Sequence, residues 1–155
     1  MTGVIDSRLA ELGIELPEAP APAANYVPWV VTGNLVFIAG QVPFRDGSLS
    51  HVGKLGDAFT VEDGRECARI VAINILAQLR AACGGDLDRV RRCVKLGGFV
   101  NATPDFTDQP MVINGASDLI VEIFGEAGKH ARFAVGAPSL PFDAAVEIDA
   151  VFEIG

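Results

Sequence analysis

The sequence is poor in cysteine and contains one tryptophan and one tyrosine. Its three cysteines, Cys67, Cys83 and Cys93, are an odd number and are widely spaced. This pattern indicates neither a disulfide framework nor a zinc site, so we expect a reducing, cytoplasmic setting. Cys67 and Cys93 are predicted to be core residues, because free cysteine is among the most often buried residue types.

Positive charge is also scarce. The chain carries 12 Lys and Arg against 20 Asp and Glu, which gives a net charge of −8. Nucleic-acid binding needs clustered basic side chains. The densest basic group here, Arg89 to Lys95, is typical of a solvated strand edge, so nucleic acid is not an expected partner.

Several motifs are missing. The chain has no glycine loop with the spacing of a dinucleotide or phosphate site and no nucleophile elbow. His51 and His130 are isolated, which predicts no metal site. The N-terminus has no apolar signal-peptide region. The uncharged stretch from Ala19 to Phe44 is interrupted by four prolines, so it predicts turns and short strands and no membrane contact.

Apolar residues, by contrast, are abundant. They make up 50% of the 155 residues, and mean hydropathy is +0.34. This length suits one domain, and the composition excludes global disorder. A chain this apolar has more apolar surface than a monomer readily hides, so we expect an oligomer.

The N-terminal part predicts a short helix over Ile5–Leu12, capped near Asp6 or Ser7, followed by a Pro/Ala-rich linker over Glu15–Asn25. We therefore divide the chain into a helix and arm over residues 1–21 and a main domain over residues 22–155.

The main domain shows an alternation of strand and helix patterns. Tyr26–Thr32 and Leu35–Ala39, joined by Gly33-Asn34, predict a β-hairpin. A loop over 45–58 leads to a helix capped by Thr60 and ended by Gly84-Gly85. The remaining predicted elements are a strand over Val90–Asn101 with Val94, Leu96, Gly98 and Val100 on one face, a helix over Gln109–Phe124, and strands over Ala131–Gly136 and Ala145–Ile154.

This order predicts one α+β domain with a mixed sheet and both long helices on one face. The other sheet face would lie open and cannot all be polar. Burial against copies of the chain would cover it.

Two charged residues stand in apolar strands. Arg132 lies within Ala131–Val135, and Glu147 within Ala144–Ile148. An Arg can bind a carboxylate bidentately, and a partly desolvated Glu can act as acid or base. From residue types alone, the two could equally pair with each other or point to solvent.

The strand ending Ile38-Ala-Gly-Gln-Val-Pro43, the helix start Val112-Ile-Asn114 and the pieces His130-Ala-Arg132 and Val146-Glu-Ile-Asp-Ala150 resemble the RidA/YjgF family, also labelled L-PSP endoribonuclease-like. The resemblance covers about Pro22 to Gly155. The N-terminal arm and the Asn114–Leu119 segment are similar to the family's longer branch.

The resemblance implies a chorismate-mutase-like fold and a homotrimer with pockets between subunits. It also implies hydrolysis of 2-imino acids or enamines to 2-keto acids and ammonia. No cofactor is implied, because an imine carbon is already electrophilic. The partner would be a small carboxylate-bearing molecule.

Matched residue by residue, Arg132 would hold the substrate carboxylate and Glu147 would handle the attacking water. Tyr26 matches the N-terminal aromatic of the pocket, and Asn114 matches an Asn of the second helix with a one-residue shift. Ala134 would contribute its backbone N–H.

The chain departs from the family pattern after the arginine. Phe133 and Ala134 stand where deaminases have a small hydroxyl residue and Cys, so Phe133 either reshapes the pocket or packs in the core. Two alternatives stay open for this reason: a catalytically silent carboxylate-binding trimer and, against the charge balance, a ribonuclease.

Overall fold

The computed structural model describes residues 3–19 and 25–155. A five-stranded sheet has its strands in the order β1-β2-β7-β5-β6. They are β1 (Trp29–Thr32), β2 (Leu35–Gln41), β5 (Val90–Asn101), β6 (Ala131–Ala137) and β7 (Val146–Ile154). β5 and β6 are parallel and the other pairs are antiparallel, which confirms the predicted mixed sheet. β6 is therefore an edge strand.

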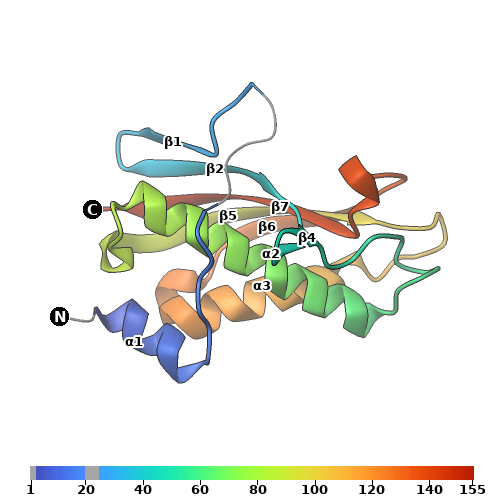
Figure 1. The fold of residues 1–155 in the computed structure, drawn as a ribbon, viewed down its shortest axis with the longest axis horizontal. Helices are drawn as coiled ribbons and strands as arrows, with labels where there is room; N and C mark the ends of the chain where they lie inside the picture. The colour runs from blue at the N-terminus through green and yellow to red at the C-terminus, as the bar shows by residue number, and fades with distance from the viewer. Residues whose placement is uncertain (1–2, 20–24) are drawn as a thin grey trace.

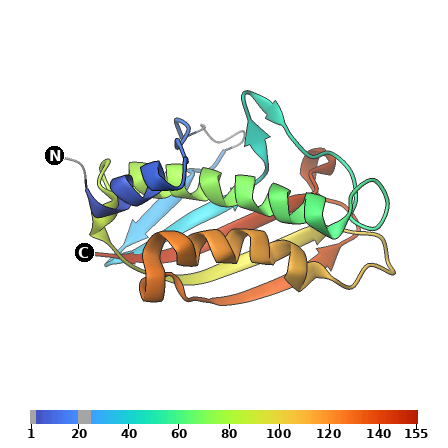
Figure 2. The ribbon, with the colours of Figure 1, turned by 90° about the horizontal axis from the view of Figure 1, so that it is seen from below.

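The two long helices, α2 (Val61–Ala82) and α3 (Gln109–Phe124), lie side by side on one face of the sheet (Figures 1 and 2). Thr60 and Asp63 form a capping box at the start of α2, where Asp63 N donates to Thr60 Oγ1 at 3.3 Å. Gly125 ends α3 at φ +63°. The predicted arrangement of helices is confirmed.

The core fills the space between this face and the helices. β7 contributes Val146, Ile148, Ala150, Phe152 and Ile154 at alternate positions, all buried. Gly98 lets α3 approach β5, because a Cβ there would lie 2.7 Å from Ile113.

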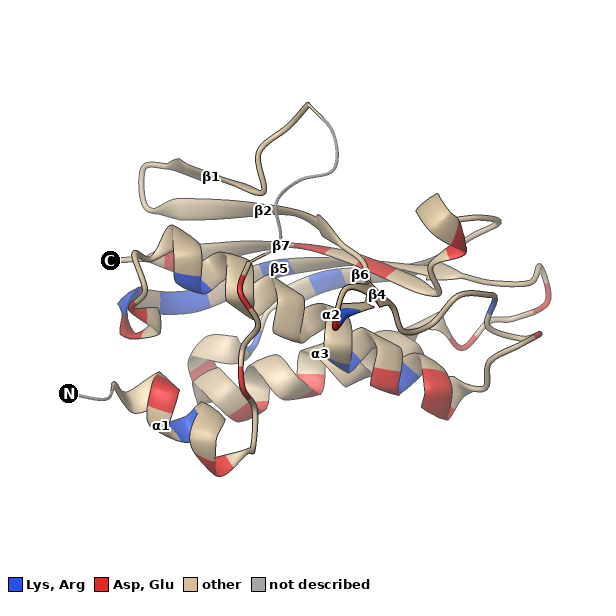
Figure 3. Ribbon diagram, in the orientation of Figure 1, with Lys and Arg blue, Asp and Glu red and all other residues tan. Residues whose placement is uncertain are grey.

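Neither of the two long helices lies on the opposite face of the sheet (Figures 1 and 2). On it, Val30 pairs with Phe37 across β1 and β2, and Phe99 pairs with Val135 across β5 and β6. The exposures of these four residues are 50%, 45%, 38% and 43%. We call these four residues the apolar patch. The β1–β2 hairpin beneath part of the patch carries no charged residue (Figure 3).

Three local expectations are wrong. β5 has a bulge between Cys93 and Lys95, so Cys93 packs in the core and Val94 is exposed. The predicted 45–58 loop contains part of a small hairpin of β3 (Phe44–Arg45) and β4 (Ser48–Leu49), and Asp46 and Gly47 adopt positive φ at its turn.

The third concerns α1 (Val4–Glu11), whose N-cap is Gly3 and not Asp6 or Ser7. The Asp88 carboxylate caps the helix instead, because Val4 N and Ile5 N donate to it at 3.0 and 2.9 Å.

The arm after α1 runs along α2, and Arg80 donates to the carbonyls of Leu16 and Pro17. Residues 20–24 of the predicted Pro/Ala linker lie outside the described residues. Within the described part of the chain, no helix is both long and apolar enough to cross a bilayer.

Candidate functional site

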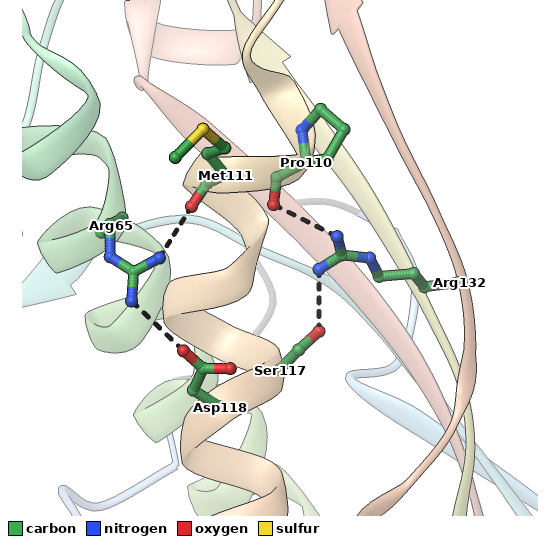
Figure 4. A network of polar contacts seen from close by, with 6 residues as sticks. All are labelled: Arg65, Pro110, Met111, Ser117, Asp118 and Arg132. Carbon is green, nitrogen blue, oxygen red and sulfur yellow. Dashed lines mark hydrogen bonds and ion pairs between the residues drawn. The ribbon is translucent and has the colours of Figure 1, made fainter.

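Arg132 projects from the edge strand β6 toward α3. Its Nη1 donates to Ser117 Oγ and its Nη2 to the Pro110 carbonyl, each at 3.1 Å (Figure 4). The side chain is half-buried. Its strand pairs in parallel with β5, where Leu96 is its neighbour and faces the helices.

Asn114 belongs to the same helix face. Pro110, Asn114 and Ser117 are four and then three residues apart, which places them along one side of α3. Two of the three bind Arg132, so this side of the helix faces β6. Asn114 therefore lies on the side of α3 that faces Arg132.

A second arginine makes matching contacts on the other side of α3. Arg65 of α2 donates to the Met111 carbonyl at 3.1 Å and to the Asp118 carboxylate at 3.2 Å (Figure 4). Its charge is thus paired, whereas both partners of Arg132 are neutral. Because an arginine has five N–H donors, Arg132 keeps three beyond the two bonds described. Its charge and those donors can receive an anionic group.

Glu147 lies on the open face of the sheet. It stands opposite Phe99 of β5, and its side chain covers Gly40, where a Cβ would lie 2.4 Å from the carboxylate. Half-burial raises the pKa of Glu147 above its ordinary value, and the carboxylate of Asp149 raises it further. A carboxyl group of this kind can exchange a proton closer to neutral pH.

Arg132 and Glu147 do not meet within one subunit. Arg132 points to the helix side of the sheet and Glu147 to the open side, and β5 separates their strands. The interpretation that the two residues simply pair with each other is therefore wrong. One subunit alone holds two separate halves of the predicted site.

The other predicted residues are divided between these halves. Tyr26 is exposed and lies two residues before Pro28. The Pro28 carbonyl accepts from Ala39 N at 2.9 Å, so Tyr26 leads into the hairpin near Gly40 and Glu147. Ala134 lies on β6 and its side chain packs against the core.

Phe133 turns to the open face. Its ring meets Phe99 edge-on with centroids 5.2 Å apart, and Lys95 Nζ lies 5.3 Å from the ring centre. It therefore packs beside the apolar patch and not among the helix-facing core residues.

One cavity in the described residues lies away from these side chains. Its volume is about 790 Å³, and it is walled by the arm, the β3–β4 hairpin and α2. None of the predicted site residues lines it. Within the described residues, no group of three His, Cys, Asp or Glu side chains is placed to hold a metal ion.

Three residues beside the site were missed from the sequence. Ser117 and His130 join the contacts of Arg132, since Ser117 Oγ lies 2.8 Å from His130 Nε2. His130 looked isolated because its partner is on another element. Gly40 makes room for Glu147, and its place between Ala39 and Gln41 in the quoted strand motif was the available signal.

Comparison with known proteins identifies the fold and its relatives. The family model described as "YjgF/chorismate_mutase-like, putative endoribonuclease" matches residues 6–153. "Protein TCP17" of Trypanosoma cruzi is 50% identical over 154 residues, which is 99% of this chain and 96% of that protein. A RutC family protein of Pyrococcus horikoshii is 34% identical, over 86% of this chain and 90% of its own.

Solved structures agree with this. The crystal structure of the protein Atu1372 from Agrobacterium tumefaciens has a TM-score of 0.92 and 50% identity, covering 98% of this chain and 93% of its own. RidA from the Antarctic bacterium Psychrobacter sp. PAMC 21119 has a TM-score of 0.62 and 28% identity, covering 88% and 94%.

Proposed function

Because this chain belongs to the YjgF/chorismate-mutase-like family, which includes RidA, we propose that it hydrolyses 2-imino acids or enamines to 2-keto acids and ammonia. The observation that carries the proposal is the unpaired charge of Arg132. It is a half-buried guanidinium with neutral partners, next to an open strand edge, in a chain of net charge −8. A small carboxylate is the ligand that this charge suits.

The reaction needs few groups. Arg132 binds the substrate carboxylate and fixes the imine carbon in place. Glu147 accepts a proton from water as the water oxygen adds to that carbon. It returns this proton to the nitrogen, which gives a carbinolamine. Glu147 then moves the hydroxyl proton of the carbinolamine to the nitrogen, the C–N bond breaks, and ammonia leaves as the carbonyl forms. The raised pKa of Glu147 suits both steps.

The two halves come together in an assembly of subunits. We propose a trimer in which the apolar patch is covered by neighbouring chains, and the Arg132 half of one subunit meets the Glu147 half of the next. Tyr26 then joins Glu147 in lining the pocket, and Asn114 and the backbone N–H of Ala134 join Arg132. Phe133, beside the patch, forms part of the wall.

An amino-acid oxidase that releases a 2-imino acid, coupled to keto-acid detection, tests the activity. We expect the protein to accelerate keto-acid release and Arg132→Ala to remove nearly all of the acceleration. Arg65→Ala is the matched control, because it removes an equally placed arginine whose charge is already paired. Equal, negligible rates for wild type and Arg132→Ala would refute the deaminase.

Mixed oligomers test the shared site. When Arg132→Ala and Glu147→Gln chains are unfolded together and refolded, random assembly should leave about a quarter of the sites intact if each site takes one residue from each neighbour. No recovery is expected if both residues come from one chain. Binding of a 2-keto acid through Arg132 without turnover would favour a silent binding protein, and RNA cleavage lost in Glu147→Gln would favour the ribonuclease.

A further inference from the structure

A chain of hydrogen bonds runs from Arg132 to a backbone carbonyl. Arg132 Nη1 donates to Ser117 Oγ at 3.1 Å, Ser117 Oγ lies 2.8 Å from His130 Nε2, and His130 Nδ1 lies 2.6 Å from the Gly128 carbonyl oxygen. Ser117 comes from the middle of α3, and His130 stands directly before β6. The chain therefore ties the guanidinium to both elements that flank it.

The direction of each bond in this chain is fixed by its far end. A carbonyl oxygen only accepts, so His130 Nδ1 carries the proton and donates to Gly128. In a neutral imidazole Nε2 is then an acceptor, and the Ser117 hydroxyl donates to it. A lone pair of Ser117 Oγ is left to accept from Arg132. Every group thus has one role, and no hydroxyl rotation or ring flip preserves all three bonds.

The carbonyl at the end of the chain is itself firmly placed. Gly128 closes the 3-10 turn η2 (Gly125–Gly128) and is buried against α3. A Cβ at this position would lie 2.5 Å from the Ile120 carbonyl oxygen, so only glycine allows the approach. The chain of bonds therefore begins on rigid backbone and ends on a flexible arginine.

We propose that Ser117 and His130 are positioning residues that hold the Arg132 guanidinium in one orientation for the substrate carboxylate. With Nη1 bound to Ser117 and Nη2 to Pro110, the guanidinium plane is set by two points on α3. Its remaining N–H groups then face the ligand without reordering. This inference deepens the proposed function and rests on it for the identity of the ligand.

The first experiment examines the chain of hydrogen bonds from Arg132 to Gly128 without any substrate. In protein labelled with ¹⁵N-histidine, we expect His130 to carry its proton on Nδ1, with the resonances assigned through a His51→Asn variant. Ser117→Ala should shift the Nε2 resonance of His130 and speed rotation about the Arg132 Nε–Cζ bond. Ser117→Thr, which keeps the hydroxyl, should restore both. A proton on Nε2, or an Arg132 rotation unaffected by Ser117→Ala, would overturn the proposal.

The second experiment measures the consequence for the reaction. Ser117→Ala should raise KM for the imino acid by about ten- to a hundredfold, as expected for one lost bond to a charged group, with kcat within about twofold. Ser117→Thr should return KM to the wild-type value. An unchanged KM in an active enzyme would contradict positioning. If the wild type proves inactive, the proposed function fails. The His130 resonances and the Arg132 bond rotation still test whether Ser117 and His130 position the guanidinium.

Discussion

The two faces of the central sheet are built from alternate residues of the same strands, yet they carry different kinds of residue. On the helix-covered face, β7 presents an unbroken apolar row that ends at Phe152 and Ile154. On the open face, the same strand presents Glu147, Asp149, Val151 and Glu153, beside the exposed rings of Phe37 and Phe99. The helix-covered face is buried entirely by residues of the same chain.

The other face mixes apolar rings with carboxylates, one of which is half-buried before any neighbour arrives. A face of this kind is typical of an interface that also contains a site. The proposed trimer would therefore use other residues of the sheet than those that form the core, so folding and assembly can each be disturbed without the other.

The largest effect is expected from the covered face. Phe152 is fully buried and meets Phe124 with ring centroids 6.1 Å apart, whereas Phe37 is 45% exposed. Phe152→Ala should lower the free energy of unfolding by about 3–5 kcal/mol, because it leaves a cavity. Phe37→Ala should cost much less in the isolated subunit. Urea denaturation measures both free energies of unfolding. Similar losses in the two variants would contradict the distinction between the two faces of the sheet.

A charge placed on the open face should break the assembly and spare the fold. Phe37→Asp should yield a single chain by light scattering, with wild-type helix content by circular dichroism. Val4→Asp, which alters an exposed apolar residue on α1, is the control and should leave the particle mass unchanged. A Phe37→Asp protein with the particle mass of the wild type would show that the patch is not the contact of the proposed trimer.

A smaller effect concerns pH and Glu147. Its raised pKa means that the folded protein binds this proton more tightly than the unfolded chain does, so the ionised form costs stability at neutral pH. The cost disappears as pH falls below the ordinary pKa of a glutamate. Glu147→Gln should therefore melt at a higher temperature than wild type at pH 7, with a smaller difference at pH 4.

Glu122→Gln, on the exposed side of α3, serves as the control for this measurement and should show no such gain. Asp149→Asn should lower the pKa of Glu147, because it removes the nearby like charge. A Glu147→Gln protein that melts below wild type at pH 7 would contradict the assignment.

The smallest effect concerns the rate at which the cysteine thiols react with a labelling reagent. All three cysteines are buried, and burial raises the pKa of Cys67 and of Cys93 to about 12. A thiol reagent should therefore label the native protein at least about a hundredfold more slowly than the unfolded chain. Rapid labelling of Cys93 in native protein would place it on the open side of the sheet.

Much of the fold could be predicted from the sequence because its signals are local. A few adjacent residues determine the spacing of apolar side chains in α3, the glycine that ends this helix and the Gly33-Asn34 turn. Gly33 adopts φ +59°, as the first position of such a hairpin turn requires. The β5 bulge was missed because an extra residue leaves no mark in a run such as Cys93-Val-Lys95.

The site was harder to predict for a related reason. Arg132 and Glu147 stood out because charges are rare in apolar strands. Their separation onto opposite faces depends on strand order, which alternation within each strand does not reveal. The partnership of Ser117 and His130 joins residues 13 apart across a helix and a turn. No spacing rule links them, and only the packing of η2 on α3 brings them together.

The cap of α1 has a consequence for how the chain is made. A ribosome synthesises α1 first, but Asp88, which accepts from its first amides, follows 84 residues after Val4. An eight-residue helix is marginal alone in water. We therefore expect the N-terminal segment to stay unfolded until the turn before β5 has been synthesised. α1 then docks after that turn has formed, although it is translated before it.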